Sequence, residues 1–250
     1  MLVACYFAML GCYVTHSPWL GLGAGIVGAV LMTLIFGLFT IFLYADQVVV
    51  GTAINLLALG VTGTLFRSKF GQSGQLLSVP RIPAFHGVDL LMVFMLLSAP
   101  ALWILLRKTA WGLAVRACGE YPKAVDAAGF SVHRLRLQAL LVGAIYSGLA
   151  GSYLALVITG SFAENMTAGR GFVAIAMVTF GRWKPQFAFL AALLIGFTES
   201  LQYRFQTYGW KVPYQLMIAL PYVVALLVLV IVGKGSAAPG ALAQPYRKEK

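Results

Sequence analysis

The sequence has few charged residues, and this scarcity limits the class of protein it can be. Asp, Glu, Lys and Arg make up 10% of the 250 residues, whereas hydrophobic residues make up 60%. Soluble globular domains carry charged residues at about a quarter of their positions. The composition therefore excludes a soluble globular domain, and the long apolar runs predict a polytopic membrane protein.

Residues that perform chemistry are also scarce. The sequence contains no phosphate-binding loop ending in Gly-Lys-Ser/Thr, no HExxH or GxSxG motif and no paired carboxylates. Its cysteines show neither metal-ligand spacing nor a disulfide framework; they are Cys5, Cys12 and Cys118. We therefore expect that the chain is not an enzyme and that it holds no cofactor or metal of its own.

One glycine pattern has two interpretations. Residues 23–28 match the Gly-x-Gly-x-x-Gly of dinucleotide-binding proteins, but that motif must join a strand to a helix. Here the pattern lies within a long apolar run, so we reject nucleotide binding. Gly21, Gly25 and Ala29 instead predict a face of small residues that lets helix backbones approach closely.

Eight hydrophobic segments are candidates for membrane helices. They cover residues 2–14, 19–44, 48–66, 86–107, 136–158, 168–181, 185–204 and 213–232. The predicted fold is all-α, a polytopic transmembrane helical bundle in which some helices are short or broken. Residues 1–234 form the predicted transmembrane domain, and residues 235–250 a disordered cytoplasmic tail.

Two of these segments are unusual. Segment 168–181 is short for a straight span, and segment 48–66 contains Asn55 together with several glycines and threonines. Broken or re-entrant helices occur where protein or water covers them, and transporters use them at substrate sites. Ordinary tilted helices that pack through small residues would give the same pattern, so both interpretations stay open.

The net charge of +11 indicates a membrane orientation rather than nucleic-acid binding. Residues 107–136 form a charged island that holds six of the 18 Lys and Arg residues. If the loop 108–135 is cytoplasmic, both termini are cytoplasmic too, with twelve basic residues inside and six outside. Cytoplasmic loops carry the basic excess, so this orientation is favoured.

Local signals within the island predict a short helix. Pro122 suits the first helical position, Gly129 suits a C-terminal stop, and Ser131 can cap the helix that follows. A two-turn helix is unstable alone in water, so we expect other residues to pack against it. Its small apolar residues, which include Ala124 and Ala127, suit docking into a groove of a partner, although a plain surface connector is the alternative.

Polar residues near the apolar segments are candidates for the substrate pathway. An ionisable group inside a membrane is costly and marks function by default. Asn55, Glu164, Asn165 and Glu199 are the residues predicted to face a central cavity. A structural alternative for Glu164 is an ion pair with Arg170 that orders the loop between them.

Four stretches of the sequence resemble the permease subunits of bacterial ATP-binding-cassette importers for simple sugars and nucleosides. They are residues 118–129 (CGEYPKAVDAAG), 45–60 (ADQVVVGTAINLLALG), 162–176 (FAENMTAGRGFVAIA) and 180–185 (FGRWKP). The resemblance implies that residues 119–129 form the coupling helix of the family, which the ATPase subunits grip. The residues that it assigns to this contact are Gly119, Glu120, Pro122, Ala124, Ala127 and Gly129.

The same resemblance implies an importer of a nucleoside or simple sugar in the bacterial inner membrane. Its partners would be a second permease subunit, a cytoplasmic ATP-binding subunit that binds the ATP, and an extracytoplasmic substrate-binding lipoprotein. Tyr121 stands where the family usually has asparagine. Family members usually begin one or two spans earlier, so we expect this sequence to be a fragment, to have a misassigned start, or to be a short form. The alternatives are a secondary transporter or channel without an ATPase, and an integral-membrane enzyme.

Overall fold

The chain folds into helices that group into two compact units. The computed structural model describes residues 1–71, 78–85, 88–207 and 238–247, together with positions 219–220, 223–224, 226–227 and 230. Unit 1 comprises Met1–Phe94, Ala110–Ala168 and Ala241–Lys250, and unit 2 comprises Met95–Thr109 and Gly169–Gly240. Apart from one antiparallel pair, β1 (Ala84–Phe85) and β2 (Val88–Asp89), the regular elements of the described residues are helices, as predicted.

Four described helices are long and apolar enough to cross a membrane. The first is α2 (Pro18–Gly37), which continues as the π-helix η1 (Leu38–Phe42), and the second is α3 (Gln47–Phe70). The third is α4 (Leu90–Lys108), and the fourth is α7 (Val132–Tyr153), which continues as the π-helix η2 (Leu154–Thr159).

Shorter apolar helices account for the remaining described segments. They are α1 (Leu2–Thr15), α8 (Arg170–Phe180) and the apolar part, Pro185–Leu201, of α9 (Pro185–Thr207). Each predicted segment before residue 207 therefore coincides with a helix. The predicted segment 213–232 lies largely outside the described residues.

The two segments that the sequence marks as unusual have different structures. The helix α3 runs without a break over 24 residues, so the broken-helix interpretation of 48–66 is wrong. By contrast, α8 has 11 residues. At 1.5 Å per residue it is about 16 Å long, roughly half of a hydrocarbon core. Segment 168–181 is therefore a short helix that cannot cross alone.

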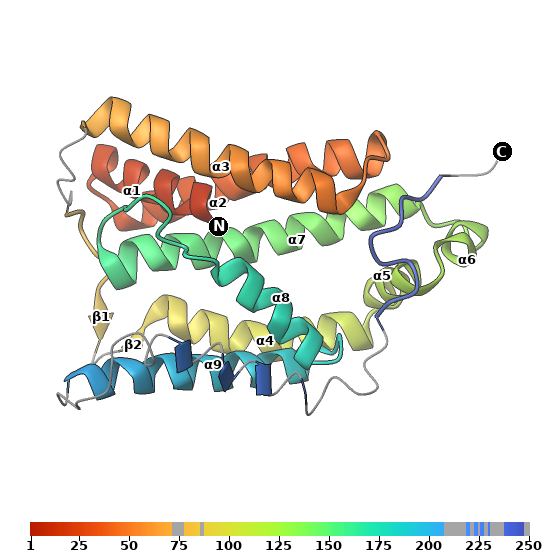
Figure 1. The fold of residues 1–250 in the computed structure, drawn as a ribbon. Helices are drawn as coiled ribbons and strands as arrows, with labels where there is room; N and C mark the ends of the chain where they lie inside the picture. Colours follow the sequence, from red (N-terminus) through yellow and green to blue (C-terminus); the bar gives the residue numbers. More distant parts are fainter. Residues whose placement is uncertain are drawn as a thin grey trace. The chain divides into compact units, whose positions relative to one another are not determined.

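Close contacts between small residues hold unit 1 together. Figure 1 shows α1, α2, α3 and α7 side by side, and α1 packs against the other three. A Cβ added to Gly21 would lie 2.6 Å from the carbonyl oxygen of Ala8, and one added to Gly148 would lie 2.7 Å from Cα of Ile26. Only glycine fits at these positions, which confirms the predicted face of small residues on α2.

The core of unit 1 is centred on α1. Eight of its residues are buried, and they lie against the glycine face of α2 and the small residues of α7. At one end of the unit the aromatic ring of Phe162 packs between Tyr6 of α1 and Phe66 of α3. The loop after η2 is thereby fixed to the helix bundle.

In unit 2, α8 packs against α9 through a small apolar cluster. Phe180, Ala191 and Ile195 are its buried members. The helix α9 begins at Pro185, a residue favoured at the first helical position. The cluster explains why α8 is stable despite its length, since packing rather than propensity stabilises short helices.

The tail differs from its prediction. We expected disorder from residue 235, yet residues 241–247 begin with a turn and belong to unit 1. The backbone N–H of Ala241 donates to the carbonyl of Gly119, and Arg136 donates to the carbonyl of Gln244. The Gly- and Pro-rich composition favours disorder, but specific partners in α5 (Ala110–Glu120) and α7 fix this segment.

Candidate functional site

The charged island, residues 107–136, contains a short helix, α6 (Pro122–Ala127), between α5 and α7. Pro122 is its first residue, and Gly129 has a φ of 84°, the left-handed conformation expected of a glycine stop. The hydroxyl of Ser131 accepts the backbone N–H of Arg134 at 3.5 Å, at the start of α7. All three local predictions are therefore confirmed.

One side of α6 is buried. Val125 packs into a cluster that α5 and α7 complete; the other buried members are Ala114, Cys118, Val132 and Leu135. This cluster is the packing that a two-turn helix needs. Because Cys118 is only 4% exposed, it is a poor target for a thiol reagent.

The other side of α6 is open. Ala124 and Ala127 are exposed, and they are flanked by exposed aromatic rings at Tyr121 and Phe130, with 62% and 51% of their surface accessible. Of the remaining predicted contact residues, Gly119 is half-buried in α5, Pro122 is half-buried, and Glu120 and Gly129 are exposed. Small side chains bounded by aromatic ones form a shallow apolar surface that can be laid into a groove.

Tyr121 precedes α6 without capping it. Its φ of −145° and ψ of 86° are not helical, and no side chain caps the first turn. The missing cap has a physical cost, since a capping asparagine or serine would satisfy an N–H there. The orientation of α6 therefore depends on its packing against α5 and α7.

Glu164 lies in the loop between η2 and α8 and pairs with α3. Arg67 donates from Nε to Oε1 at 2.6 Å and from Nη2 to Oε2 at 2.5 Å. The expected pair between Glu164 and Arg170 is therefore wrong: the loop brings Glu164 back over the C-terminal turn of α3. The carboxyl group also lies 3.7 Å from the position that a Cβ on Gly63 would take.

This pair changes the acidity of Glu164. The hydrogen bonds from Arg67 are the main cause that lowers the pKa of the Glu164 carboxyl below its usual value; partial desolvation opposes the shift, and the positive charge of Arg67 adds to it. The carboxyl is consequently ionised over the whole physiological range.

A nearby segment fixes the start of this loop. The N–H groups of Val79 and Ile82 donate to the carbonyls of Gly160 and Leu156 at 2.9 and 3.3 Å. Arg81 donates to the carbonyl of Thr159 at 3.0 Å. These donors satisfy carbonyls at the end of η2 that have no partner within the helix.

Asn55 is exposed on α3 and lies away from Glu164. The buried residues of α3 are Ala58, Thr62, Gly63 and Phe66, and none precedes Ala58. Asn55 precedes them, eight residues before Gly63, or about 12 Å along the helix. The structure therefore does not bring Asn55 and Glu164 together.

The last two pathway candidates lie in different places. Asn165 is exposed in the loop with a φ of 57°, a conformation that asparagine tolerates better than most residues. Glu199 is half-buried on α9 of unit 2, where its Oε1 lies 3.8 Å from Nε of Arg170. Arg170 thus has an acidic partner, but it is Glu199 instead of Glu164.

The sequence interpretation missed two polar pairs. With the loop 108–135 in the cytoplasm, the chain after segment 48–66 and the chain after segment 136–158 fall on the same side of the membrane, and this was the available signal for the pair of Arg67 and Glu164. Asp89 is 5% exposed and accepts hydrogen bonds from the hydroxyl of Tyr153 at 3.0 Å and the N–H of Met92 at 2.7 Å. It caps α4 and ties it to α7, and no local pattern indicates the tyrosine.

The apolar helices and the closely packed glycine faces define an α-helical membrane protein, with a short helix in the loop between two spans. The family described as branched-chain amino acid transport system / permease component matches residues 1–233. The chain belongs to this family and is a multi-pass permease subunit of an ATP-binding-cassette transporter.

Several relatives have assigned transport roles. The chain is 33% identical to the guanosine ABC transporter permease protein NupQ of Bacillus subtilis, over 94% of this chain and 79% of the relative. It is 30% identical to the nucleoside ABC transporter permease protein NupC of Lactococcus lactis, over 96% and 81%. It is 29% identical, over 100% and 87%, to a Haloferax volcanii protein provisionally assigned as a glucose ABC transporter permease. No solved structure gave a significant match.

Proposed function

We propose that the chain imports a nucleoside, or a simple sugar, into the cytoplasm with energy from ATP that a partner subunit hydrolyses. The observation that carries this proposal is the short helix α6, held on one side by Val125 and open on the side of Ala124 and Ala127. It occupies the loop in which the resemblance locates the coupling helix. The names of the relatives support the substrate class.

The geometry of α6 suits transmission of movement. The helix is anchored to α5 and α7 through the cluster around Val125. Because α7 continues to the π-helix η2, a displacement of α6 has a direct structural route along one apolar helix. Packed helices transmit a displacement of this kind when they can adopt two discrete arrangements.

For the pathway, Asn55 is the strongest candidate. An amide that faces hydrocarbon costs about 2–4 kcal/mol, and a water-filled pathway removes most of that cost. Asn55 is exposed in the part of α3 that precedes its first buried residue, Ala58. Asn165 and Glu199 are weaker candidates, and the pair with Arg67 accounts for Glu164 without a substrate.

The proposed assembly has a second permease subunit, a cytoplasmic ATP-binding subunit and an extracytoplasmic binding protein, typically a lipoprotein. Both termini and the loop 108–135 face the cytoplasm of the bacterial cell, because that orientation places the basic excess inside. The chain itself binds no ATP in this proposal and performs no catalysis.

Two variants test the coupling role. Ala127→Glu places a charge on the open face of α6, where burial in an apolar groove would leave it unpaired. Ala110→Glu places the same charge on the exposed first residue of α5 and is the matched control. We expect Ala127→Glu to abolish co-purification of the ATP-binding subunit and Ala110→Glu to preserve it. Normal co-purification and uptake in Ala127→Glu would refute the coupling role.

A further inference from the structure

Residues 241–247, here called the strap, contact elements on both sides of α6. Before α6 in the chain, the N–H of Ala241 donates to the carbonyl of Gly119 at 2.9 Å, in the last turn of α5. After α6, Arg136 lies in the first turns of α7, and its Nη1 donates to the carbonyl of Gln244 at 2.9 Å. The strap therefore bridges the two elements that flank α6.

Aromatic and cationic contacts extend this attachment. Tyr246 packs against the cluster that buries Val125, and its ring centre lies 6.1 Å from that of His133. The guanidinium of Arg247 lies 5.2 Å from the ring centre of Tyr44, within the range of a cation–π interaction. Tyr44 lies between η1 and α3, so the strap contacts three parts of unit 1: the end of α5, the start of α7 and the segment before α3.

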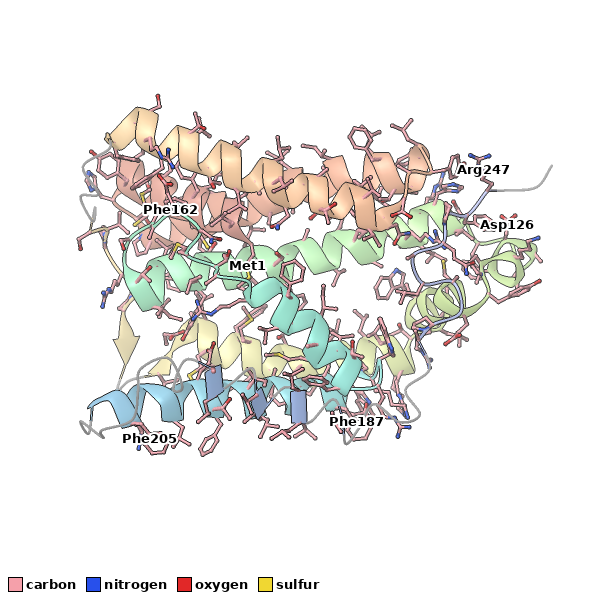
Figure 2. The ribbon with its side chains drawn as sticks, in the orientation of Figure 1. Met1, Asp126, Phe162, Phe187, Phe205 and Arg247 are labelled. Atoms are coloured by element: carbon pink, nitrogen blue, oxygen red, sulfur yellow. The ribbon has the colours of Figure 1, made fainter. Side chains whose placement is uncertain are left out.

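The figures show the same arrangement. In Figure 1 the strap, in dark blue, runs past α5 and the start of α7. Figure 2 places Arg247 and Asp126 of α6 at the same end of unit 1, opposite to Phe162. The strap and the open face of α6 therefore belong to one end of the unit.

The short helix depends on such support. It has six residues, no side-chain cap at its start and one buried residue. A helix of this length is held by its neighbours. An element that fixes the end of α5 against the beginning of α7 limits the orientations that α6 can take, and a preorganised surface binds a partner with less loss of conformational freedom.

We propose that the strap positions α6 for the ATP-binding subunit, with Arg136 and Tyr246 as positioning residues. The inference rests on the proposed coupling role of α6 and adds a second element to it. Without the strap, α6 samples more orientations, and the binding-competent fraction of the permease decreases. The apparent affinity for the ATP-binding subunit decreases by the same factor.

The test titrates purified full-length permease with its ATP-binding subunit. A chain that ends after Gly240 lacks the strap, whereas a chain that ends after Arg247 keeps it and is the matched control. Within the full chain, Arg136→Gln removes the guanidinium whose Nη1 donates to Gln244 and leaves a shorter side chain, and Arg134→Gln changes an exposed neighbouring arginine. Tyr246→Ala removes the ring from the cluster around Val125.

We expect strap removal, and Arg136→Gln, to weaken binding about tenfold, the effect of one or two net hydrogen bonds. Both controls should bind like the wild type. Because the defect is in positioning, a saturating concentration of ATP-binding subunit should restore uptake. If the truncated chain does not reach the membrane, Arg136→Gln and Tyr246→Ala decide the result.

Unchanged affinity in Arg136→Gln and Tyr246→Ala would overturn the inference, as would a transport defect that saturation does not correct. A failure of the strap inference can be distinguished from a failure of the proposed function. If Ala127→Glu abolishes binding and the strap variants do not alter it, the strap has no positioning role. If Ala127→Glu has no effect, the coupling role itself is wrong.

Discussion

Arg67 and Glu164 form a two-point ion pair that joins the C-terminal turn of α3 to the loop before α8, with donor–acceptor distances of 2.6 and 2.5 Å. The planar guanidinium matches the carboxylate, so the pair fixes direction as well as distance. It anchors a loop whose other contacts are the buried ring of Phe162 and the donors of segment 78–82.

The first prediction concerns this pair. Arg67→Gln or Glu164→Gln should each increase protease cleavage within residues 163–169, and the exchange Arg67→Glu with Glu164→Arg should restore part of the protection. The effect on total stability should be small, because the two side chains are 59% and 40% exposed and exposed ion pairs contribute little. Equal cleavage in single and exchanged variants would contradict an anchoring role.

The same pair has a predictable pH dependence. The pKa of Glu164 is lower in the folded chain than in the unfolded chain, mainly through the hydrogen bonds from Arg67. Its contribution to stability is therefore complete above the unfolded-state pKa and is lost as the pH falls through the lowered folded-state pKa. Protection of the loop should decrease in that acidic window in the wild type. The Glu164→Gln variant should not show this acid-dependent loss of protection.

The second prediction concerns the packing of α2. Gly21→Ala places a methyl group 2.6 Å from the carbonyl of Ala8 and should destabilise the protein by about 1–3 kcal/mol. Gly23→Ala, two residues along the same helix, meets nothing within 4 Å and should be neutral or slightly stabilising. Thermal unfolding in detergent compares the two. Equal midpoints would show that α1 and α2 do not pack through this face.

The third prediction concerns the end of α6. Gly129 has open space around it, so the cost of a side chain comes from its φ of 84° alone. Gly129→Val should be destabilised locally by about 1–2 kcal/mol and should reduce binding of the ATP-binding subunit. Gly129→Asn should be milder, because asparagine tolerates this conformation. Identical binding by both variants would show that the left-handed stop is not needed.

The fourth prediction concerns Asn55. Asn55→Leu keeps the side-chain volume roughly constant and removes the amide, so substrate uptake should lose apparent affinity or rate. Asn55→Gln keeps the amide and is the matched control. A panel of nucleosides, pentoses and hexoses measured with both variants reports the substrate class as well. Unchanged uptake kinetics in Asn55→Leu would make Asn55 a structural residue.

The orientation needs a reporter other than Cys118. That thiol is buried against Val125 and would escape an impermeant reagent from either side. Tyr121→Cys, in a chain whose three native cysteines are replaced, puts a thiol at a position that is 62% exposed. It should be protected in intact cells and labelled after permeabilisation. Labelling in intact cells would reverse the proposed orientation.

Local signals explain what the sequence could predict. Pro122, Gly129 and Ser131 act within one turn of their own positions, and their effects on α6 and α7 follow from backbone geometry. The apolar segments followed from length and composition in the same way. The glycine face of α2 was also visible, since Gly21 and Gly25 lie four residues apart.

Partners across the fold were not predictable. The choice of Arg67 over Arg170 for Glu164 depends on where a loop returns to α3, which no local pattern encodes. The tail shows the same limit: its composition favours disorder, and only the arrangement of Gly119, Arg136 and Tyr44 provides its contacts. The composition of a segment indicates its own tendency to be disordered, but it carries no information about the surface against which the segment packs.

The central claim is that α6 connects this permease to an ATPase that drives import. The most direct measurement reconstitutes the permease, its ATP-binding subunit and its binding protein in vesicles, and follows uptake of a panel of radiolabelled nucleosides and simple sugars. The account predicts uptake only when hydrolysable ATP is present on the side of α6, and none with Ala127→Glu. Uptake driven by an ion gradient without the ATP-binding subunit, or unchanged by Ala127→Glu, would contradict it.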